Sequence, residues 1–123
     1  MNGIDYLIDT NVMVYILQGN PCVQHFAQED MFAVSCITEM ELLGKFLISE
    51  GEKRTITRML SQCFIIDLNY YIKQLAINIR QNMRMKLPDA IIAATALQQN
   101  LTLVSADKDF CKIADLDLLL ITI

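Results

Sequence analysis

Short apolar runs alternate with longer stretches of helical periodicity along this chain. The apolar runs predict strands, bounded by turn-forming or charged residues. They fall at residues 4–8, 31–35, 63–66, 101–104 and 118–123. Apolar residues at helical spacing predict helices between these runs. They fall at residues 11–18, 22–28, 38–48, 52–60, 70–85, 88–99 and 107–113. Because strands that alternate with helices need crossover connections, we expect a mostly parallel sheet.

Some of these segments lack a polar face. The runs at 101–104 and 118–121 are apolar on both faces, which is typical of strands covered by helices on two sides. Residues 90–97 are apolar nearly all round, so the helix that contains them is expected to be buried and central. The expected fold is therefore α/β, a three-layer α/β/α arrangement around about five strands. A length of 123 residues fits one domain, over residues 1–123.

Composition excludes several classes of protein. Hydrophobic residues make up 54% of the chain, which is too many for a disordered protein. No apolar run approaches the ~18 residues of a membrane span, so no membrane segment is expected. The first residues include Asp5 and Asp9 but no Lys or Arg, which argues against a signal peptide. Four cysteines without a CxxC pair, beside a single histidine, disfavour a zinc site and favour reduced thiols in the cytoplasm.

The charge balance narrows the possible partners. Ten Lys and Arg stand against fourteen Asp and Glu, which gives a net charge of −4. This argues against a protein held on nucleic acid by bulk positive charge. It leaves room for a nuclease with an acidic metal site, because without four site carboxylates the chain carries ten charges of each sign.

Four carboxylates occur where predicted strands end or predicted helices begin. Asp9 closes the first strand, Glu41 and Asp89 lie in first turns of helices, and Asp107 follows the fourth strand, with Asp109 two residues on. The carboxyl ends of parallel strands share one edge, where open α/β folds bind ligands. We therefore expect Asp9, Glu41 and Asp107 at one rim of the sheet. Asp89 joins them if its helix begins there.

Ionised carboxylates at such close quarters repel one another, so either some are protonated or a hard divalent cation binds. Oxygen ligands without His or Cys suit Mg²⁺ or Mn²⁺. Mg²⁺ held by few carboxylates keeps several waters, and it can make water more acidic while it binds a phosphate oxygen. The pattern therefore points to phosphodiester hydrolysis.

Each of these acids also has a local structural explanation. Thr38 and Glu41 match a capping box, with Glu41 reaching back to the Thr38 amide. Asp89 beside a helix-starting proline favours the helix dipole. Asp9 and Asp107 fit helix N-caps. From spacing alone, a metal site and a set of helix caps both remain open.

Four segments resemble the motifs of the PIN domain family, in the family's order and over nearly the whole chain. They are LIDTNV at 7–12, SCITEMEL at 35–42, LPDAIIAATA at 87–96 and LVSADKDF at 103–110. The resemblance is closest to the small VapC-like toxins of toxin–antitoxin pairs. It implies a parallel five-stranded sheet between helices and Mg²⁺- or Mn²⁺-dependent endonuclease cleavage of RNA.

The same resemblance assigns roles to particular residues. It implies that Asp9, Glu41, Asp89 and Asp107 are the catalytic and metal-binding quartet. Supporting hydroxyls would come from Thr38 and from Ser105, which stands where the family usually has Thr. Asp109 competes with Asp107 for the fourth ligand position, and Asp107 is favoured because it is closer to the strand end. Asn11 would orient water or phosphate, or would form a hydrogen bond at the helix N-terminus.

The resemblance also implies partners: an RNA substrate, a second copy of the chain in a homodimer, and an antitoxin protein. The segments at 13–17 and 46–48 contain more apolar residues than one buried helix face needs. This excess fits either a surface covered by a partner protein or ordinary core packing. Seven cations are candidates for RNA contacts, without a defined patch. They are Lys45, Lys53, Arg54, Arg58, Arg80, Arg84 and Lys86.

One alternative has the same fold without catalytic activity. It is a catalytically silent PIN-like module that binds RNA or protein. The intact quartet argues against it. A response-regulator receiver would need an acidic pair after the first strand and a Lys after the last strand, and the sequence has neither.

Overall fold

The computed structural model describes residues 3–28 and 31–123. Residues 1, 2, 29 and 30 of the predicted domain lie outside the described residues. The strands are β1 (Tyr6–Ile8), β2 (Phe32–Ser35), β3 (Phe64–Ile66), β4 (Thr102–Ser105) and β5 (Leu118–Leu120). The helices are α1 (Thr10–Leu17), α2 (Gln24–Gln28), α3 (Cys36–Leu43), α4 (Glu50–Leu60), α5 (Tyr70–Asn82) and α6 (Leu87–Gln99), with a 3₁₀ helix at Lys108–Lys112.

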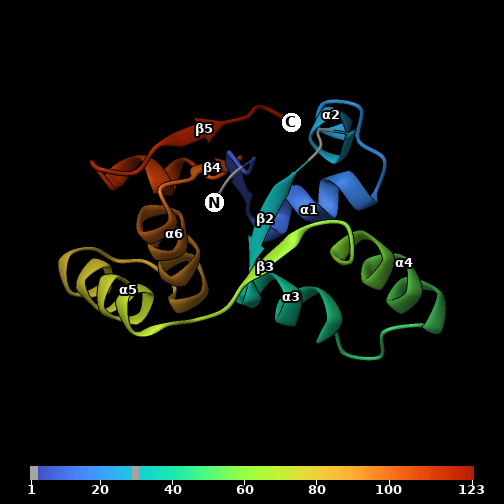
Figure 1. Ribbon diagram of the computed structural model, residues 1–123, viewed down its shortest axis with the longest axis horizontal. Helices are drawn as coiled ribbons and strands as arrows, with labels where there is room; N and C mark the ends of the chain where they lie inside the picture. The colour runs from blue at the N-terminus through green and yellow to red at the C-terminus, as the bar shows by residue number, and fades with distance from the viewer. Residues whose placement is uncertain (1–2, 29–30) are drawn as a thin grey trace.

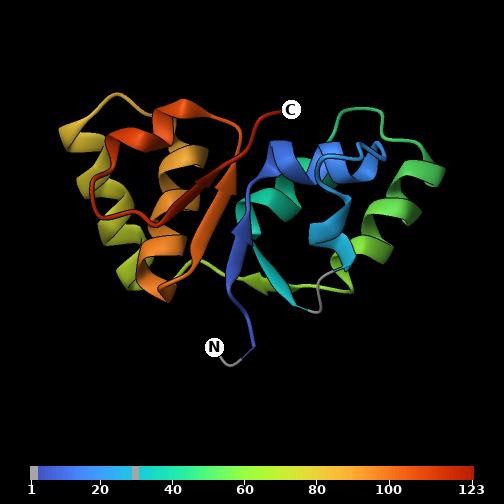
Figure 2. The same cartoon turned by 90° about the horizontal axis from the view of Figure 1, so that it is seen from above.

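The strands form one five-stranded sheet in the order β3-β2-β1-β4-β5, and every pairing is parallel. The predicted α/β fold with a parallel sheet is therefore confirmed. The central strand β1 lies between β2 and β4, with Ile8 opposite Val104. Figure 2 shows the arrows of β1 and β4 pointing to the same edge of the sheet. The segments that follow these two strands therefore lie side by side.

Two hydrophobic cores lie on opposite faces of the sheet. One core contains Leu7 and Leu103 together with the buried residues of α5 and α6. The other contains Ile8 and Val104 together with residues of α1, α2, α3 and α4. Neighbouring residues of one strand thus enter different cores, as the alternation of side chains along a strand requires. Figures 1 and 2 show the resulting layers, with α5 and α6 on one side and α1 to α4 on the other.

Helix α6 is the central helix of the first core. Residues 90–96 are all buried, which confirms the expectation from their apolar sequence. Its packing partner is α5, whose residues Ile72, Ala76 and Ile79 face the same core. The helix begins at Leu87 with Pro88 in its first turn, where the missing amide hydrogen costs no helical hydrogen bond.

Helix α3 differs from its prediction at both ends. It spans Cys36–Leu43 rather than 38–48, because Ser35 is its N-cap and accepts a hydrogen bond from the Ile37 amide at 3.1 Å. It ends at Gly44, and the residues beyond it form a loop. Phe46 and Leu47 in this loop are 87% and 83% exposed. The excess of apolar residues therefore reaches the surface at these two positions, whereas the α1 residues Met13 and Ile16 belong to the core.

The last strand also differs from its prediction. β5 spans only Leu118–Leu120, and as the edge strand it leaves Leu119 and Leu120 exposed, so it is not covered on both faces. Helix α5 ends at Asn82, three residues before the predicted end, which leaves residues 83–86 as a connection to α6. Within residues 3–28 and 31–123, every helix is too short or too polar to cross a membrane.

Candidate functional site

Asp9 stands at the carboxyl end of the central strand and is 4% exposed. Its backbone amide continues the sheet by donating to the Val104 carbonyl of β4 at 3.2 Å. Its side chain caps α1, with Oδ1 accepting the Val12 amide at 2.9 Å. The sequence-based cap is thus present. A carboxylate has two oxygens and about four acceptor positions, so this cap leaves much of its hydrogen-bonding capacity unused.

The adjacent strand β4 brings Ser105 and Asp107 to the same edge. Ser105 is fully buried, and its Oγ accepts the Asp107 amide at 3.0 Å. Because this amide occupies an acceptor position, the Ser105 hydroxyl hydrogen remains free to be donated to the Asp9 carboxylate. Asp107 is the N-cap of the 3₁₀ helix, and its Oδ1 accepts the Asp109 amide at 2.9 Å.

Asp89 approaches from the other layer, in the first turn of α6. It is partly buried, and burial is the main reason that its pKa is raised. The negative charges of Asp107, Glu41 and Asp109 raise the pKa further, while Lys86 lowers it. Helix α6 therefore begins at the same rim of the sheet as Asp107. The sequence alone had left the position of this helix start undecided.

Burial likewise raises the pKa of Asp9, and the charges of Asp89 and Asp107 add to this effect. The Ser105 hydroxyl and the Val12 amide oppose it, because both stabilise the charged form. Asp9, Asp89 and Asp107 thus share one region of negative potential. The charges of Asp89 and Asp107 make Asp9 harder to ionise, and the charge of Asp107 does the same to Asp89.

Glu41 reaches this region by a different route. The predicted capping box with Thr38 is wrong, because Ser35 caps α3 and places Glu41 in the second turn of the helix. Instead, the Thr10 hydroxyl donates to Glu41 Oε1 at 2.7 Å. Thr10 Oγ1 also lies 2.9 Å from Thr38 Oγ1. Since the Thr10 hydrogen is used for Glu41, the buried Thr38 hydroxyl is the donor of that second bond.

Thr10 is a residue that the sequence analysis missed. It follows Asp9 directly and connects the start of α1 to α3 through its two hydroxyl contacts. The sequence signal that could have identified Thr10 is its position beside Asp9 in the LIDTNV segment. Nothing in the sequence showed that its side chain contacts Glu41, 31 residues away. Asn11, the other candidate in this segment, is exposed on α1.

The donor chemistry of the cluster fits a hard divalent cation, although the carboxylates are not tightly gathered. Among residues 3–28 and 31–123, no three His, Cys, Asp or Glu side chains lie close enough together to ligate one ion. Mg²⁺ needs no such cage, since proteins commonly hold it by one or two carboxylates while it keeps several waters. Asp9, Asp89 and Asp107 supply carboxylate oxygens, which suit this mode of binding.

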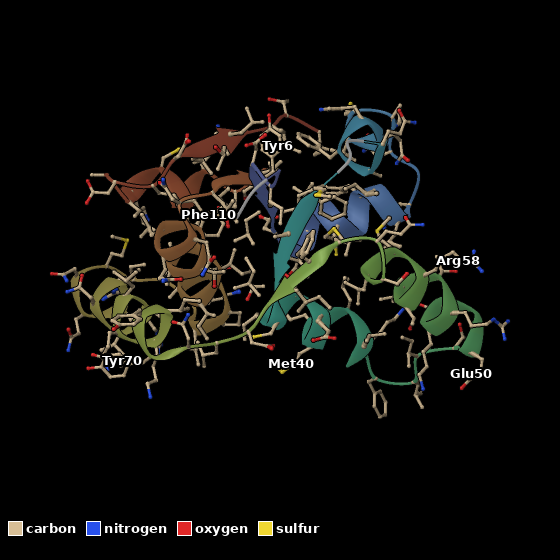
Figure 3. The ribbon with its side chains drawn as sticks, in the orientation of Figure 1. Tyr6, Met40, Glu50, Arg58, Tyr70 and Phe110 are labelled. Atoms are coloured by element: carbon tan, nitrogen blue, oxygen red, sulfur yellow. The ribbon has the colours of Figure 1, made fainter. Side chains whose placement is uncertain are left out.

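A cleft of about 500 Å³ opens beside the carboxylates. Phe110, labelled in Figure 3, is one of its lining residues and is itself buried. The cleft is lined by Arg80, Arg84, Met85, Lys86, Asp89, Asp107, Asp109 and Phe110. Three of the seven candidate cations therefore gather beside the acidic cluster, which the sequence had not shown. Asp109 is exposed and lies 3.4 Å from Lys112 Nζ, whereas Asp107 is partly buried.

Comparisons with known proteins agree with this arrangement. Residues 6–116 match the family model of the PIN domain. A toxin–antitoxin complex from Klebsiella pneumoniae contains a chain that is 30% identical, with a TM-score of 0.78, covering 91% of this chain and 95% of that one. The VapBC2 complex from Rickettsia felis, bound to a fragment of its promoter DNA, contains a chain 27% identical, with a TM-score of 0.78 and coverage of 97% and 99%.

A DNA-bound VapBC from Salmonella typhimurium shares the fold with a TM-score of 0.84, at 20% identity and with coverage of 94% and 97%. No curated protein matches the chain. The similarity to these solved structures extends over nearly the full length of each chain.

Proposed function

This chain belongs to the PIN domain family, and on that premise we propose that it is a Mg²⁺-dependent endoribonuclease, the toxin of a toxin–antitoxin pair. Mn²⁺ would serve as well, because both ions prefer oxygen ligands. The observation that carries the proposal is the gathering of Asp9, Asp89 and Asp107 at one edge of the sheet, where burial and neighbouring negative charges raise the pKa of Asp9 and of Asp89. Such a cluster gains stability when a dication neutralises it.

Each residue of the cluster has a distinct task in this proposal. One or two carboxylates of Asp9, Asp89 and Asp107 would ligate the cation directly, and the others, with Glu41 as the fourth member of the quartet, would act through its bound waters. When bound, the cation would supply an acidified water and charge stabilisation at the scissile phosphate. The Ser105 hydroxyl favours the charged form of Asp9 and so opposes part of the effect of burial. The Thr10 hydroxyl, which Thr38 positions, donates to Glu41 Oε1 at 2.7 Å. A carboxylate left free by the cation would accept the proton from the attacking water.

The test is cleavage of a labelled RNA by variants that keep the shape of the side chain. Asp9→Asn and Asp89→Asn should each lower the rate by roughly a hundredfold or more, the usual cost of a lost acid–base or electrostatic contribution. Asp115→Asn is the matched control, because Asp115 is exposed and lies outside the cluster, and its rate should equal that of the wild type. Circular dichroism would verify that each variant is folded. Full activity in Asp9→Asn would contradict the assignment.

The spacing of the carboxylates favours one second candidate, a silent PIN domain that binds RNA or protein. No three acidic side chains of the described residues are close enough to share an ion. A wild-type protein that binds RNA but does not cleave it at any Mg²⁺ or Mn²⁺ concentration would establish this alternative.

The proposed antitoxin partner has support at the surface. Phe46 and Leu47 are almost fully exposed at the end of α3, near a second cleft whose lining includes Leu17, Leu42 and Ile56. Exposed apolar surface of this kind is typical of a site covered by another protein. A homodimer is also part of the proposal, and sedimentation at high concentration tests it, since a monomer there would exclude it.

A further inference from the structure

We propose that Arg80 and Arg84 form a phosphate-binding rim that holds the RNA backbone beside the acidic cluster. This inference rests on the proposed function and adds the direction from which the substrate reaches the site. It concerns the cleft that is lined by residues at and just beyond the carboxyl end of α5. Figure 1 shows α5 and α6 together on one side of the sheet.

The first argument is the position of the two arginines. Both line the cleft that also contains Asp89 and Asp107, and both are exposed. Arg80 lies in the last turn of α5, where its Nε donates to the Met85 carbonyl at 3.3 Å. This bond fixes the guanidinium against the connection to α6 and leaves its other N–H groups free to bind an anion. A cation here also suits the helix dipole, but Arg84 lies beyond the helix end, where the dipole does not explain it.

The second argument is that the cleft on the other side of the cluster has a single lining cation, which is already paired. There, Glu41 lines a cleft of about 600 Å³ whose cation is Lys45. Lys45 Nζ lies 2.7 Å from Glu52 Oε2 and is thus already paired. Within the described residues, the ion pairs are this one and Lys112 with Asp109, so the arginines of the rim are not used in any of them. Of the two clefts that include a carboxylate of the proposed quartet, the one on the α5 side is therefore the one whose cations lie outside the ion pairs of the described residues.

The third argument concerns what the rim would recognise. Guanidinium groups bind phosphate through several N–H donors at once, which suits them to a nucleic acid backbone. Phe110 is the aromatic side chain that lines the cleft, and at 2% exposed it offers no face for a base to stack on. The contacts are therefore with phosphate, and they position the strand without reading its sequence.

The test is binding of a fluorescent single-stranded RNA of about twenty nucleotides, measured by anisotropy in EDTA so that cleavage does not interfere. The double variant R80Q/R84Q should bind about tenfold more weakly than the wild type at moderate salt. The slope of log K against log salt should fall by about 1.4, because each lost phosphate contact of a single strand contributes about 0.7. Lys86 is left unchanged, because its charge also acts on Asp89.

The matched control is K53Q/R54Q, which removes the same charge from exposed positions on α4. Figure 3 shows α4, marked by Arg58, on the far side of the molecule from Phe110. This control should bind RNA within about twofold of the wild type, since long-range effects of exposed charge are screened by salt. Arg80→Lys should recover part of the affinity by restoring the charge. If R80Q/R84Q fails to fold, Arg84→Gln alone should reduce the salt slope by about 0.7.

The rim is refuted if R80Q/R84Q binds as well as the wild type, if K53Q/R54Q loses as much affinity, or if the wild type shows no measurable binding. Failure of the rim and failure of the nuclease proposal are distinguishable. Normal binding by R80Q/R84Q together with an inactive Asp89→Asn refutes the rim alone. Weak binding by R80Q/R84Q together with a fully active Asp89→Asn refutes the proposed catalytic site and leaves the rim.

Discussion

At the scale of single residues, the local and the functional explanations of the acidic side chains hold together. Asp9 and Asp107 are helix caps, as their sequence positions predict, and each uses Oδ1 for that purpose. Both still belong to a shared cluster, since the charge of Asp107 raises the pKa of both Asp9 and Asp89, and the charge of Asp89 raises the pKa of Asp9. The cap orients the carboxylate through one oxygen and leaves the other oxygen available. Sequence reasoning treated these roles as alternatives, whereas a carboxylate has capacity for both.

The raised pKa of Asp9 leads to a prediction about stability and pH. The folded state binds its proton more tightly than the unfolded chain, whose ordinary value is 3.8. The contribution of Asp9 is therefore greatest below pH 3.8 and is lost as the pH rises through the folded pKa. Asp9→Asn keeps the acceptor for the Val12 amide but cannot ionise. In EDTA at pH 7, we expect Asp9→Asn to have a higher Tm than the wild type.

This prediction has its own control. At a pH below 3.8 the difference in Tm between Asp9→Asn and the wild type should vanish, because the wild-type carboxyl is then neutral in both states. Asp115→Asn should leave the Tm unchanged at both pH values, since Asp115 is exposed. A wild type that is more stable than Asp9→Asn at pH 7 without metal would contradict the electrostatic account of the cluster.

At the scale of elements, helix ends were the least predictable part of the chain. Ser35 and Thr38 are both good N-cap residues, and the sequence analysis chose the second. The structure uses Ser35, which is the last residue of β2 and has an extended backbone. Thr38 then falls inside α3, fully buried and bonded to Thr10. The choice was decided by a contact between two helices, which no local pattern contains.

For helix α4 we predict a substitution that lowers stability without lowering activity. Ser49 and Glu52 form a capping box, with Ser49 Oγ accepting the Glu52 amide at 3.0 Å. Ser49→Ala removes this acceptor and should lower the free energy of unfolding by about 1 kcal/mol. Denaturant unfolding measures this loss. RNA cleavage below the unfolding transition should be unchanged, and a large fall in activity would show that α4 is coupled to the catalytic site.

At the scale of the whole molecule, the acidic edge is a feature of the topology. Asp9 and Asp107 follow neighbouring parallel strands, while Asp89 is brought in by α6, the central helix of one core. The packed cores hold these carboxylates near one another despite their repulsion. The cluster thus costs stability in the absence of a cation, and the hydrophobic burial on both faces of the sheet offsets that cost.

This view predicts that Mg²⁺ stabilises the entire fold. A ligand that binds only the native state adds about 2.7 kcal/mol at a concentration 100 times its Kd. The Tm of the wild type should therefore rise with Mg²⁺ concentration and return to its starting value in EDTA. The double variant D9N/D89N, with the cluster partly neutralised, should show little of this rise. Calorimetry measures both, and equal rises in the two proteins would place the binding of Mg²⁺ elsewhere.

The sequence by itself determined the fold class and the members of the proposed cluster. Alternating strands and helices required a parallel sheet, and acids after strand ends required a shared edge, because both follow from chain periodicity and connection rules. Tertiary structure alone decided that Thr10 meets Glu41, that α6 begins at the rim, and that Arg80 and Arg84 flank the cleft. These contacts join residues far apart in the chain. They depend on how the helices pack across the sheet, and local sequence patterns carry no information about that packing.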